Sequence, residues 1–247
     1  MIHYHGTPIS GKKTDASEFL VGRHALISYE YQRDIDIVAE VCQSFILDNG
    51  AFTKWKKGGK VDIGGYIEWV GKYSKYPNFD WCLIPDVIDG NEKQNMELVE
   101  MWQMYGSGKG VPVWHMHESW DYLEFLMDEF DTVAIGSSGQ WATPGTKKWW
   151  TRMDQVMIRC CDVDGFAKVK FHGLRMLDPE VFQNIPLSSA DSTNAGVNAG
   201  SINRFGSYIP VSAGQRAQVI ANRIEQYTSA KRYDCTRLAQ VSLFDDF

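Results

Sequence analysis

The amino-acid sequence predicts an α/β protein with a (β/α)8 barrel of the TIM type, built as a single domain with a short C-terminal tail. Eight short β-branched or aromatic runs alternate with stretches of helical periodicity. The length of 247 residues is close to the roughly 250 that such barrels need. No low-complexity linker divides the chain, so we expect a barrel domain over 1–230 and a tail over 231–247. An open, doubly wound sheet is the alternative.

The strands are expected where apolar runs end in turn-forming residues. In chain order they cover 3–9, 24–30, 44–48, 79–86, 111–117, 132–138, 167–173 and 186–191. Apolar residues three and four positions apart predict the intervening helices. These cover 34–43, 65–75, 91–105, 119–130, 146–161 and 178–185, and a last helix over 213–227 follows the eighth strand. Because strands and helices alternate, the sheet is expected to be parallel.

Composition and charge narrow the functional classes. The net charge of −6 argues against a surface that binds nucleic acid over its whole extent, but it allows a local basic patch. The five cysteines show no C-x-x-C spacing, so neither a disulfide framework nor a zinc knuckle is predicted. The sequence has no signal-peptide pattern and no run approaching about 18 apolar residues. We therefore expect a cytoplasmic protein without membrane contacts.

Polar residues follow almost every predicted strand from the third onward. In a (β/α)8 barrel the carboxyl ends of the strands form the active-site face, so these residues are expected to surround one mouth. They are Asp48, Asp86, His115, His117, Ser137, Ser138, Gln140, His172 and Asp191. A helix cap or a turn is the alternative role for any single aspartate, but six polar strand ends together favour a functional mouth.

Asp48 and Asp191 follow strands on different sides of the predicted mouth. Two carboxylates that face a bound sugar allow one to act as nucleophile and the other as general acid and base. Asp86 offers a carboxylate to the adjacent N–H donors of a guanine-like edge, and Phe52 offers a ring on which a base stacks. Nearby glycines allow backbone amides to approach a planar ligand; these are Gly50, Gly136, Gly139 and Gly173.

Three segments resemble the tRNA-guanine transglycosylase superfamily, and in particular its DNA branch, the phage and bacterial 7-deazaguanine DNA transglycosylases. They are "FILDNGAF" (45–52), "FHGLRMLDPEVFQNIPLSSADST" (171–193) and "NRFGSY" (203–208). The resemblance implies that Asp191 is the nucleophile and Asp48 the general acid and base. It also implies that Asp86 binds the base edge and that Phe52 stacks on the base.

The reaction implied by this resemblance is the exchange of guanine in DNA for a 7-deazaguanine base such as preQ0, without a redox cofactor or a metal. A phage-encoded member would act in the host cytoplasm. The tRNA-acting enzymes carry a C-x-C-x-x-C and histidine zinc site after the last strands, whereas this chain supplies only Cys235 there. We therefore expect DNA as the substrate, with tRNA as the alternative. Base-binding roles for His115, His117, Ser137, Ser138 and His172 are inferred from strand ends and not from a motif.

Two segments predict contacts with macromolecules. The first, "KWKKGGK" (54–60), follows Asp48 and is expected to bind the DNA backbone, with a solvated turn as the alternative. Its cations are Lys54, Lys56, Lys57 and Lys60. The second, "QVSLF" (240–244), resembles the peptides with which bacterial replication proteins bind the sliding clamp, with packing on the barrel as the alternative. Its contact residues are Gln240, Leu243 and Phe244.

Two rival functional classes remain open. A metal-dependent TIM-barrel hydrolase would use side chains from several strand ends as ligands, although the His-x-His of the familiar pattern follows the first strand and here follows the fifth. These ligands would be His115, His117, His172 and Asp191. A non-enzymatic module that binds DNA or the clamp would keep the barrel only as a scaffold, and it predicts that Asp191 is dispensable.

Overall fold

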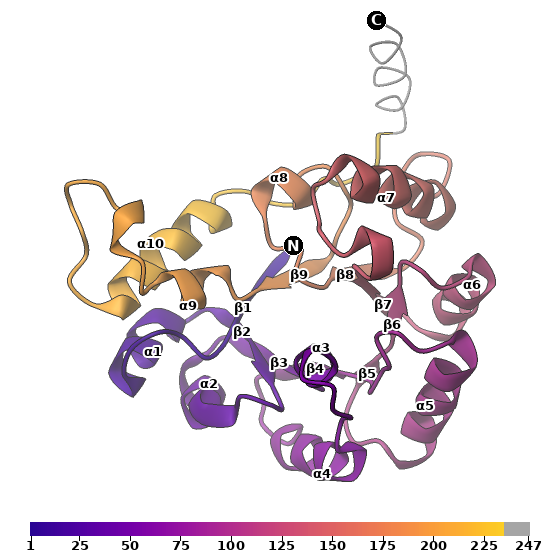
Figure 1. Ribbon diagram of the computed structural model, residues 1–247, viewed down its shortest axis with the longest axis horizontal. Helices are drawn as coiled ribbons and strands as arrows, with labels where there is room; N and C mark the ends of the chain where they lie inside the picture. The colour runs from indigo at the N-terminus through magenta and orange to yellow at the C-terminus, as the bar shows by residue number, and fades with distance from the viewer. Residues whose placement is uncertain (235–247) are drawn as a thin grey trace, which may run out of the picture.

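The computed structural model describes residues 1–234, which form a barrel of nine parallel strands with helices around it (Figure 1). The strands are β1 (Ile2–Gly6), β2 (His24–Ser28), β3 (Ser44–Asp48), β4 (Phe79–Leu83), β5 (Gly110–Val111), β6 (Val113–His115), β7 (Thr132–Gly136), β8 (Lys170–Gly173) and β9 (Ser189–Ser192). They are hydrogen-bonded in the order β5-β4-β3-β2-β1-β9-β8-β7-β6. The predicted TIM-type barrel is confirmed, and the open doubly wound sheet is wrong.

The ninth strand arises because Pro112 divides the predicted fifth strand in two. β5 pairs with β4 and β6 pairs with β7, and Pro112 alone separates the two pieces. The carbonyl of Val111 accepts the amide of Ile84, and the carbonyl of Pro112 accepts the amide of Ala134, each at 2.9 Å. Because proline has no N–H for the ladder, the chain changes its pairing partner at this residue. Both ends of the strand order therefore meet within one segment, which closes the barrel.

The helices on the outside of the barrel include all seven that the periodicity predicts. These are α2 (Ile35–Val41), α4 (Ile63–Tyr73), α5 (Glu92–Tyr105), α6 (Trp120–Glu129), α7 (Lys147–Cys160), α8 (Pro179–Phe182) and α10 (Ala213–Glu225). The elements not predicted are α1 (Lys13–Leu20), α3 (Ala51–Lys56), α9 (Asn194–Asn198) and the 3-10 turns η1 (Gln32–Asp34), η2 (Gly139–Trp141) and η3 (Ile202–Arg204). None of these has more than eight residues.

Two groups of buried apolar residues stabilise the barrel. The outer group lies between the sheet and the helices and includes Phe19 and Trp149, both fully buried. The inner group fills the barrel and consists of Tyr4, Leu26, Ile46, Trp81, Leu83, Val111, Val113 and Ala134. Burial of side chains of this size contributes about 1.5–3 kcal/mol each. The interior is therefore a packed core on which a site at the strand ends is built.

Two strands begin later than the sequence predicts. β8 begins at Lys170 because Ala167 instead pairs with Cys161 in an isolated antiparallel bridge. β9 begins at Ser189, so the predicted start at residue 186 is wrong as well. The predicted loop over 54–60 is partly helical, because α3 continues to Lys56. Five strands also end two or three residues earlier than predicted; these are β1, β2, β4, β6 and β7. Asp86, His117 and Ser138 therefore lie in the loops that follow the strands.

The packed domain extends beyond the predicted boundary at residue 230. Tyr233 is buried, its amide donates to the Gly165 carbonyl at 2.7 Å, and its hydroxyl donates to Asp154 at 2.7 Å. Within residues 1–234 no helix is both long and apolar enough to cross a membrane. The predicted clamp-binding residues lie outside the described residues, so this interaction stays a prediction; they are Gln240, Leu243 and Phe244.

Candidate active site

A cavity of about 450 Å³ lies at the carboxyl ends of the strands. Leu26 and Leu83 of the inner core also line this cavity, so it rests directly on the packed interior. Seven of the residues predicted from the sequence surround it, and they are Asp48, Phe52, Asp86, His115, Gly136, Ser137 and Asp191. The strand ends thus bring three carboxylates, one imidazole and one aromatic ring together at a single mouth.

Asp191 lies on β9 with only 5% of its surface exposed. Its Oδ1 accepts the backbone amide of Arg175 at 2.9 Å and lies 3.3 Å from Nε2 of the fully buried His172. The Nδ1 of His172 is in turn hydrogen-bonded to the Ser189 hydroxyl at 2.9 Å. Within residues 1–234 no hydrogen bond engages the second oxygen, Oδ2. Asp191 is therefore held through one oxygen, and the other is available to react.

Asp48 ends β3 and faces the same cavity. Its Oδ2 accepts the amide of Gly50 at 3.2 Å, and Gly50 has a φ of 78°, a left-handed conformation that glycine adopts without strain. Burial raises the pKa of Asp48 to about 7, and the negative charges of Asp191 and Asp86 add to the rise, while Ser28 and Gly50 oppose it. A carboxyl group with this pKa gains and loses a proton near neutral pH, as a general acid and base must.

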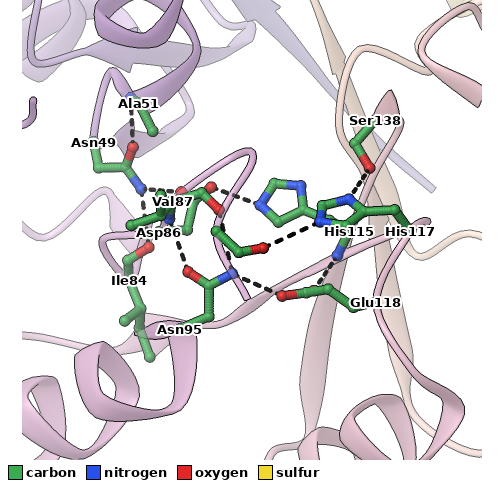
Figure 2. Close-up of polar contacts among 11 residues, drawn as sticks. Asn49, Ala51, Ile84, Asp86, Val87, Asn95, His115, His117, Glu118 and Ser138 are labelled. Atoms are coloured by element: carbon green, nitrogen blue, oxygen red, sulfur yellow. Dashed lines mark hydrogen bonds and ion pairs between the residues drawn. The ribbon is translucent and has the colours of Figure 1, made fainter. Parts of the chain in front are cut away.

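Asp86, which follows β4 beside the strand of Asp48, forms a buried pair with His115 (Figure 2). His115 Nε2 lies 2.8 Å from Asp86 Oδ2, and the side-chain amide of Asn49 donates to Asp86 Oδ1 at 2.7 Å. Burial lowers the pKa of His115, but the hydrogen bond and the charge of Asp86 outweigh burial, so the pKa is raised overall. Asn49 was not among the predicted residues, although it follows Asp48 directly in the "LDNGAF" segment.

Two further buried residues, Glu118 and Asn95, fix the backbone of His115 (Figure 2). The backbone amide of His115 donates to Glu118 Oε2 at 2.7 Å, and the Asn95 amide donates to Glu118 Oε1 at 2.7 Å. Asn95 Oδ1 accepts the amide of Val87 at 2.8 Å. Because each member of this network is hydrogen-bonded, it fixes His115 against the loop that carries Asp86. Neither residue was predicted: Asn95 lies within a helix, and Glu118 was not singled out although it directly follows the predicted strand 111–117.

We expect Asp86→Asn to lower the free energy of unfolding by about 3 kcal/mol at about pH 6, because loss of one partner leaves the other charge buried and uncompensated. In the wild type the raised pKa of His115 gives a stabilisation that is complete below its ordinary value of 6.5 and is lost as the pH rises through the folded-state pKa. The effect of the substitution should therefore shrink toward about pH 8. Urea denaturation across this pH range measures it.

The matched control is Asp89→Asn, which removes an exposed carboxylate from the same loop and should leave the stability nearly unchanged. If Asp86→Asn lowers the free energy of unfolding equally at low and high pH, His115 is not protonated in the folded protein.

Arg175 is a site residue that the predictions missed. It lines the cavity, and its backbone has a φ of 60°, which is uncommon for a residue with a side chain. The guanidinium carbon lies 4.4 Å from the centroid of the Phe52 ring, and Lys56 Nζ lies 4.5 Å from the same centroid. The sequence places Arg175 in the "FHGLR" segment after a strand, but nothing in its pattern indicates contact with Asp191 and Phe52 together.

The four predicted DNA-binding lysines differ in their surroundings. Lys54 forms an ion pair with Glu30 at 3.2 Å, so its charge is partly compensated. Lys57 Nζ lies 5.5 Å from the Tyr31 ring, and Tyr31 lines the cavity. Lys56 contacts Phe52, as described above, and Lys60 is exposed. Of the three lysines without a carboxylate partner in the described residues, Lys56 and Lys57 lie next to residues that line the cavity.

Five predicted base-binding residues do not line the cavity. Gly50 and His172 instead contact the catalytic candidates Asp48 and Asp191, respectively. His117 is exposed and is hydrogen-bonded through Nδ1 to the buried Ser138 hydroxyl at 2.8 Å. Gly173 allows close packing, because a Cβ there would lie 2.8 Å from the Leu187 side chain. The full set is Gly50, His117, Ser138, His172 and Gly173.

The ligand set of the rival metal hydrolase is not assembled. In the part of the chain that the structure describes, no group of three or more His, Cys, Asp or Glu side chains is arranged to hold a metal ion. His115 is hydrogen-bonded to Asp86, and His117 is hydrogen-bonded to Ser138. The four cysteines within residues 1–234 are free and buried; they are Cys42, Cys82, Cys160 and Cys161.

Fold and site together define a (β/α)8 barrel protein whose cavity at the strand ends is lined by three carboxylates, an imidazole and an aromatic ring. Comparison with known proteins finds no matching family, no similar curated protein and no similar solved structure. The barrel hosts many unrelated activities, so the function has to be inferred from the chemistry of the site.

Proposed function

We propose that this chain is a guanine transglycosylase that replaces guanine in DNA with a 7-deazaguanine base such as preQ0, as its resemblance to the DNA branch of the tRNA-guanine transglycosylase superfamily implies. The observation that supports this most strongly is that Asp48 and Asp191 line one cavity. Asp86 and Phe52 line it too. The cavity volume of about 450 Å³ lies in the range of small-molecule sites.

In the first half of the proposed reaction, Asp191 attacks C1′ of a guanosine that has been turned out of the duplex. The bond between C1′ and N9 breaks, an ester forms between C1′ and the carboxylate, and Asp48 gives its proton to the departing guanine. The Asp191 oxygen without a hydrogen bond, Oδ2, is the attacking atom. A pKa of about 7 leaves Asp48 substantially protonated at neutral pH, as this step needs.

In the second half, N9 of the 7-deazaguanine attacks C1′ and the ester bond breaks, which frees Asp191. Asp48, now ionised, takes the proton from N9. Two inversions at C1′ retain the β configuration of the nucleoside. The proton that leaves with guanine is thus restored by the incoming base, so the enzyme returns to its starting state without a further reactant.

Recognition of guanine is assigned to the pair of Asp86 and His115. Each carboxylate oxygen of Asp86 accepts one hydrogen bond from the protein and has room for another, which suits the N1–H and N2–H donors of guanine. Within the described residues His115 Nδ1 makes no hydrogen bond, so it is available to O6 or N7 of the base. Gly136 keeps this nitrogen accessible, because a Cβ there would lie 2.8 Å from it.

Incubation with labelled guanine or labelled preQ0 tests the proposal. Wild-type protein is expected to place the label in duplex DNA containing guanine and not in tRNA. There are two controls. In one, DNA is incubated with the same labelled base without protein, and in the other the wild type is replaced by Asp191→Asn.

The outcomes separate the alternatives. Label in tRNA alone would support the RNA-acting enzyme in place of the DNA-acting one. Absence of label from both polymers would reject transglycosylation, and the non-enzymatic module would then be favoured.

A further inference from the structure

Two cations share one aromatic ring at the rim of the cavity. Arg175 and Lys56 both lie within 4.5 Å of the centroid of Phe52. In the part of the chain described, neither of them forms an ion pair with a carboxylate. Both side chains are exposed, so each can take an anionic ligand as its partner. The rim is therefore poised to bind an anionic group.

Arg175 also connects this rim to the proposed nucleophile. Its backbone amide donates to Asp191 Oδ1 at 2.9 Å, while its side chain is exposed beside Phe52. The φ of 60° that permits both contacts is strained for a residue other than glycine. An anion bound by this guanidinium would consequently lie next to the sugar that Asp191 attacks.

We propose that Arg175 and Lys56 form a phosphodiester-binding site for the nucleotide whose base enters the cavity. This inference rests on the proposed function, because it takes a nucleotide of DNA as the ligand. The planar guanidinium fork matches phosphate oxygens, and the ammonium adds a second positive charge. A base that stacks on the Phe52 face covered by Arg175 displaces the guanidinium, and the phosphate of the same nucleotide provides its new partner. The site would distinguish a nucleotide within a polymer from a free base or nucleoside, which lack the phosphate.

The test uses three short DNA duplexes with one target guanine. One is unmodified, and the other two carry a single neutral methylphosphonate on the 5′ or the 3′ side of the target nucleotide. Binding is measured by fluorescence anisotropy over a range of salt concentrations for the wild type, Arg175→Gln and Lys56→Gln. Lys170→Gln is the matched control, because Lys170 is an exposed cation at the start of β8, far from the strand ends.

We expect one methylphosphonate position to weaken wild-type binding about tenfold, the effect of one lost charge-assisted contact. Arg175→Gln should weaken binding to the unmodified duplex by a similar factor and lower the salt slope by about one. The same methylphosphonate should then have no further effect on Arg175→Gln, whereas it should still weaken Lys170→Gln tenfold. Circular dichroism of each variant verifies folding. Should Arg175→Gln fail to fold, Arg175→Lys replaces it, because this variant keeps the charge and loses the planar guanidinium fork.

Equal binding of all three duplexes by the wild type would overturn the inference, and so would a methylphosphonate effect that persists undiminished in Arg175→Gln. Exchange of labelled guanine is followed in the same wild-type samples. Exchange with no methylphosphonate effect would reject the phosphate site alone. A methylphosphonate effect without exchange would reject the transglycosylase and retain the phosphate site.

Discussion

Asp191→Asn is expected to lower the rate of base exchange by about 10⁴-fold or more, the largest effect of any single substitution in this chain. The neutral amide of asparagine is a far weaker nucleophile than a carboxylate and does not attack C1′, so the covalent intermediate cannot form. Its oxygen can still accept the Arg175 amide that Asp191 Oδ1 accepts now. The loss of activity should therefore come without loss of the fold.

Two measurements separate chemistry from stability. Incubation of wild-type protein with DNA in the absence of an incoming base should yield a protein–DNA adduct that survives a denaturing gel, and Asp191→Asn should yield none. Urea denaturation should give free energies of unfolding for the wild type and Asp191→Asn that agree within about 1 kcal/mol. Asp178→Asn is the matched control, because Asp178 is an exposed carboxylate that caps α8 and asparagine caps a helix equally well. Exchange by Asp191→Asn at the wild-type rate would contradict the assignment of the nucleophile.

The barrel is predictable from this sequence because strands and helices alternate over a length close to that of a (β/α)8 barrel, although an open doubly wound sheet shares the alternation. What the pattern cannot give is the point at which a strand changes partner. Pro112 lies inside an otherwise regular apolar run, and only the pairing of β5 with β4 and of β6 with β7 shows why it is tolerated there. The helix α1 was missed although it buries Ala16, Phe19 and Leu20, which stand three and four positions apart, so its pattern could have predicted it.

The mouth of the cavity is predictable for a geometric reason. All strands of a parallel barrel end on one face, so Asp48, Asp86 and Asp191 are brought together by topology alone. Sequence position does not show how deep each side chain lies. His172 ends a strand as well, yet it lies fully buried beneath Asp191, where it contacts the carboxylate and not the cavity. Residues that act through a backbone amide, as Arg175 does, have no signature in sequence at all.

Asp48→Asn is expected to slow the release of guanine by about 10²- to 10³-fold, because the leaving base then has no proton donor. In the wild type, burial raises the pKa of Asp48 to about 7, so the rate of guanine release should be constant at acidic pH and fall as the pH rises through about 7. The variant should lack this decline. Single-turnover release of labelled guanine, measured across pH, gives both results.

The same substitution is expected to stabilise the protein in alkaline solution. A folded-state pKa above the ordinary value of 3.8 means that Asp48 contributes stability below that value and that this contribution is lost as the pH rises through about 7. Above that point the folded chain holds an ionised carboxylate close to Asp191, and Asp48→Asn removes this charge. Since the side chain is partly exposed in the cavity, we expect a gain on the order of 2 kcal/mol at about pH 8, a smaller gain at about pH 5 and little change at about pH 3, below the ordinary pKa.

Asp36→Asn is the control for this comparison, because Asp36 is an exposed carboxylate on α2 and its loss should alter neither rate nor stability. A variant that is both more stable and less active at high pH would identify Asp48 as a group whose burial is retained for chemistry and not for folding. A rate of guanine release for Asp48→Asn that still declines through pH 7 would instead assign the titrating proton to another group, and His115 would be the next to test, since its pKa is raised and it lines the same cavity.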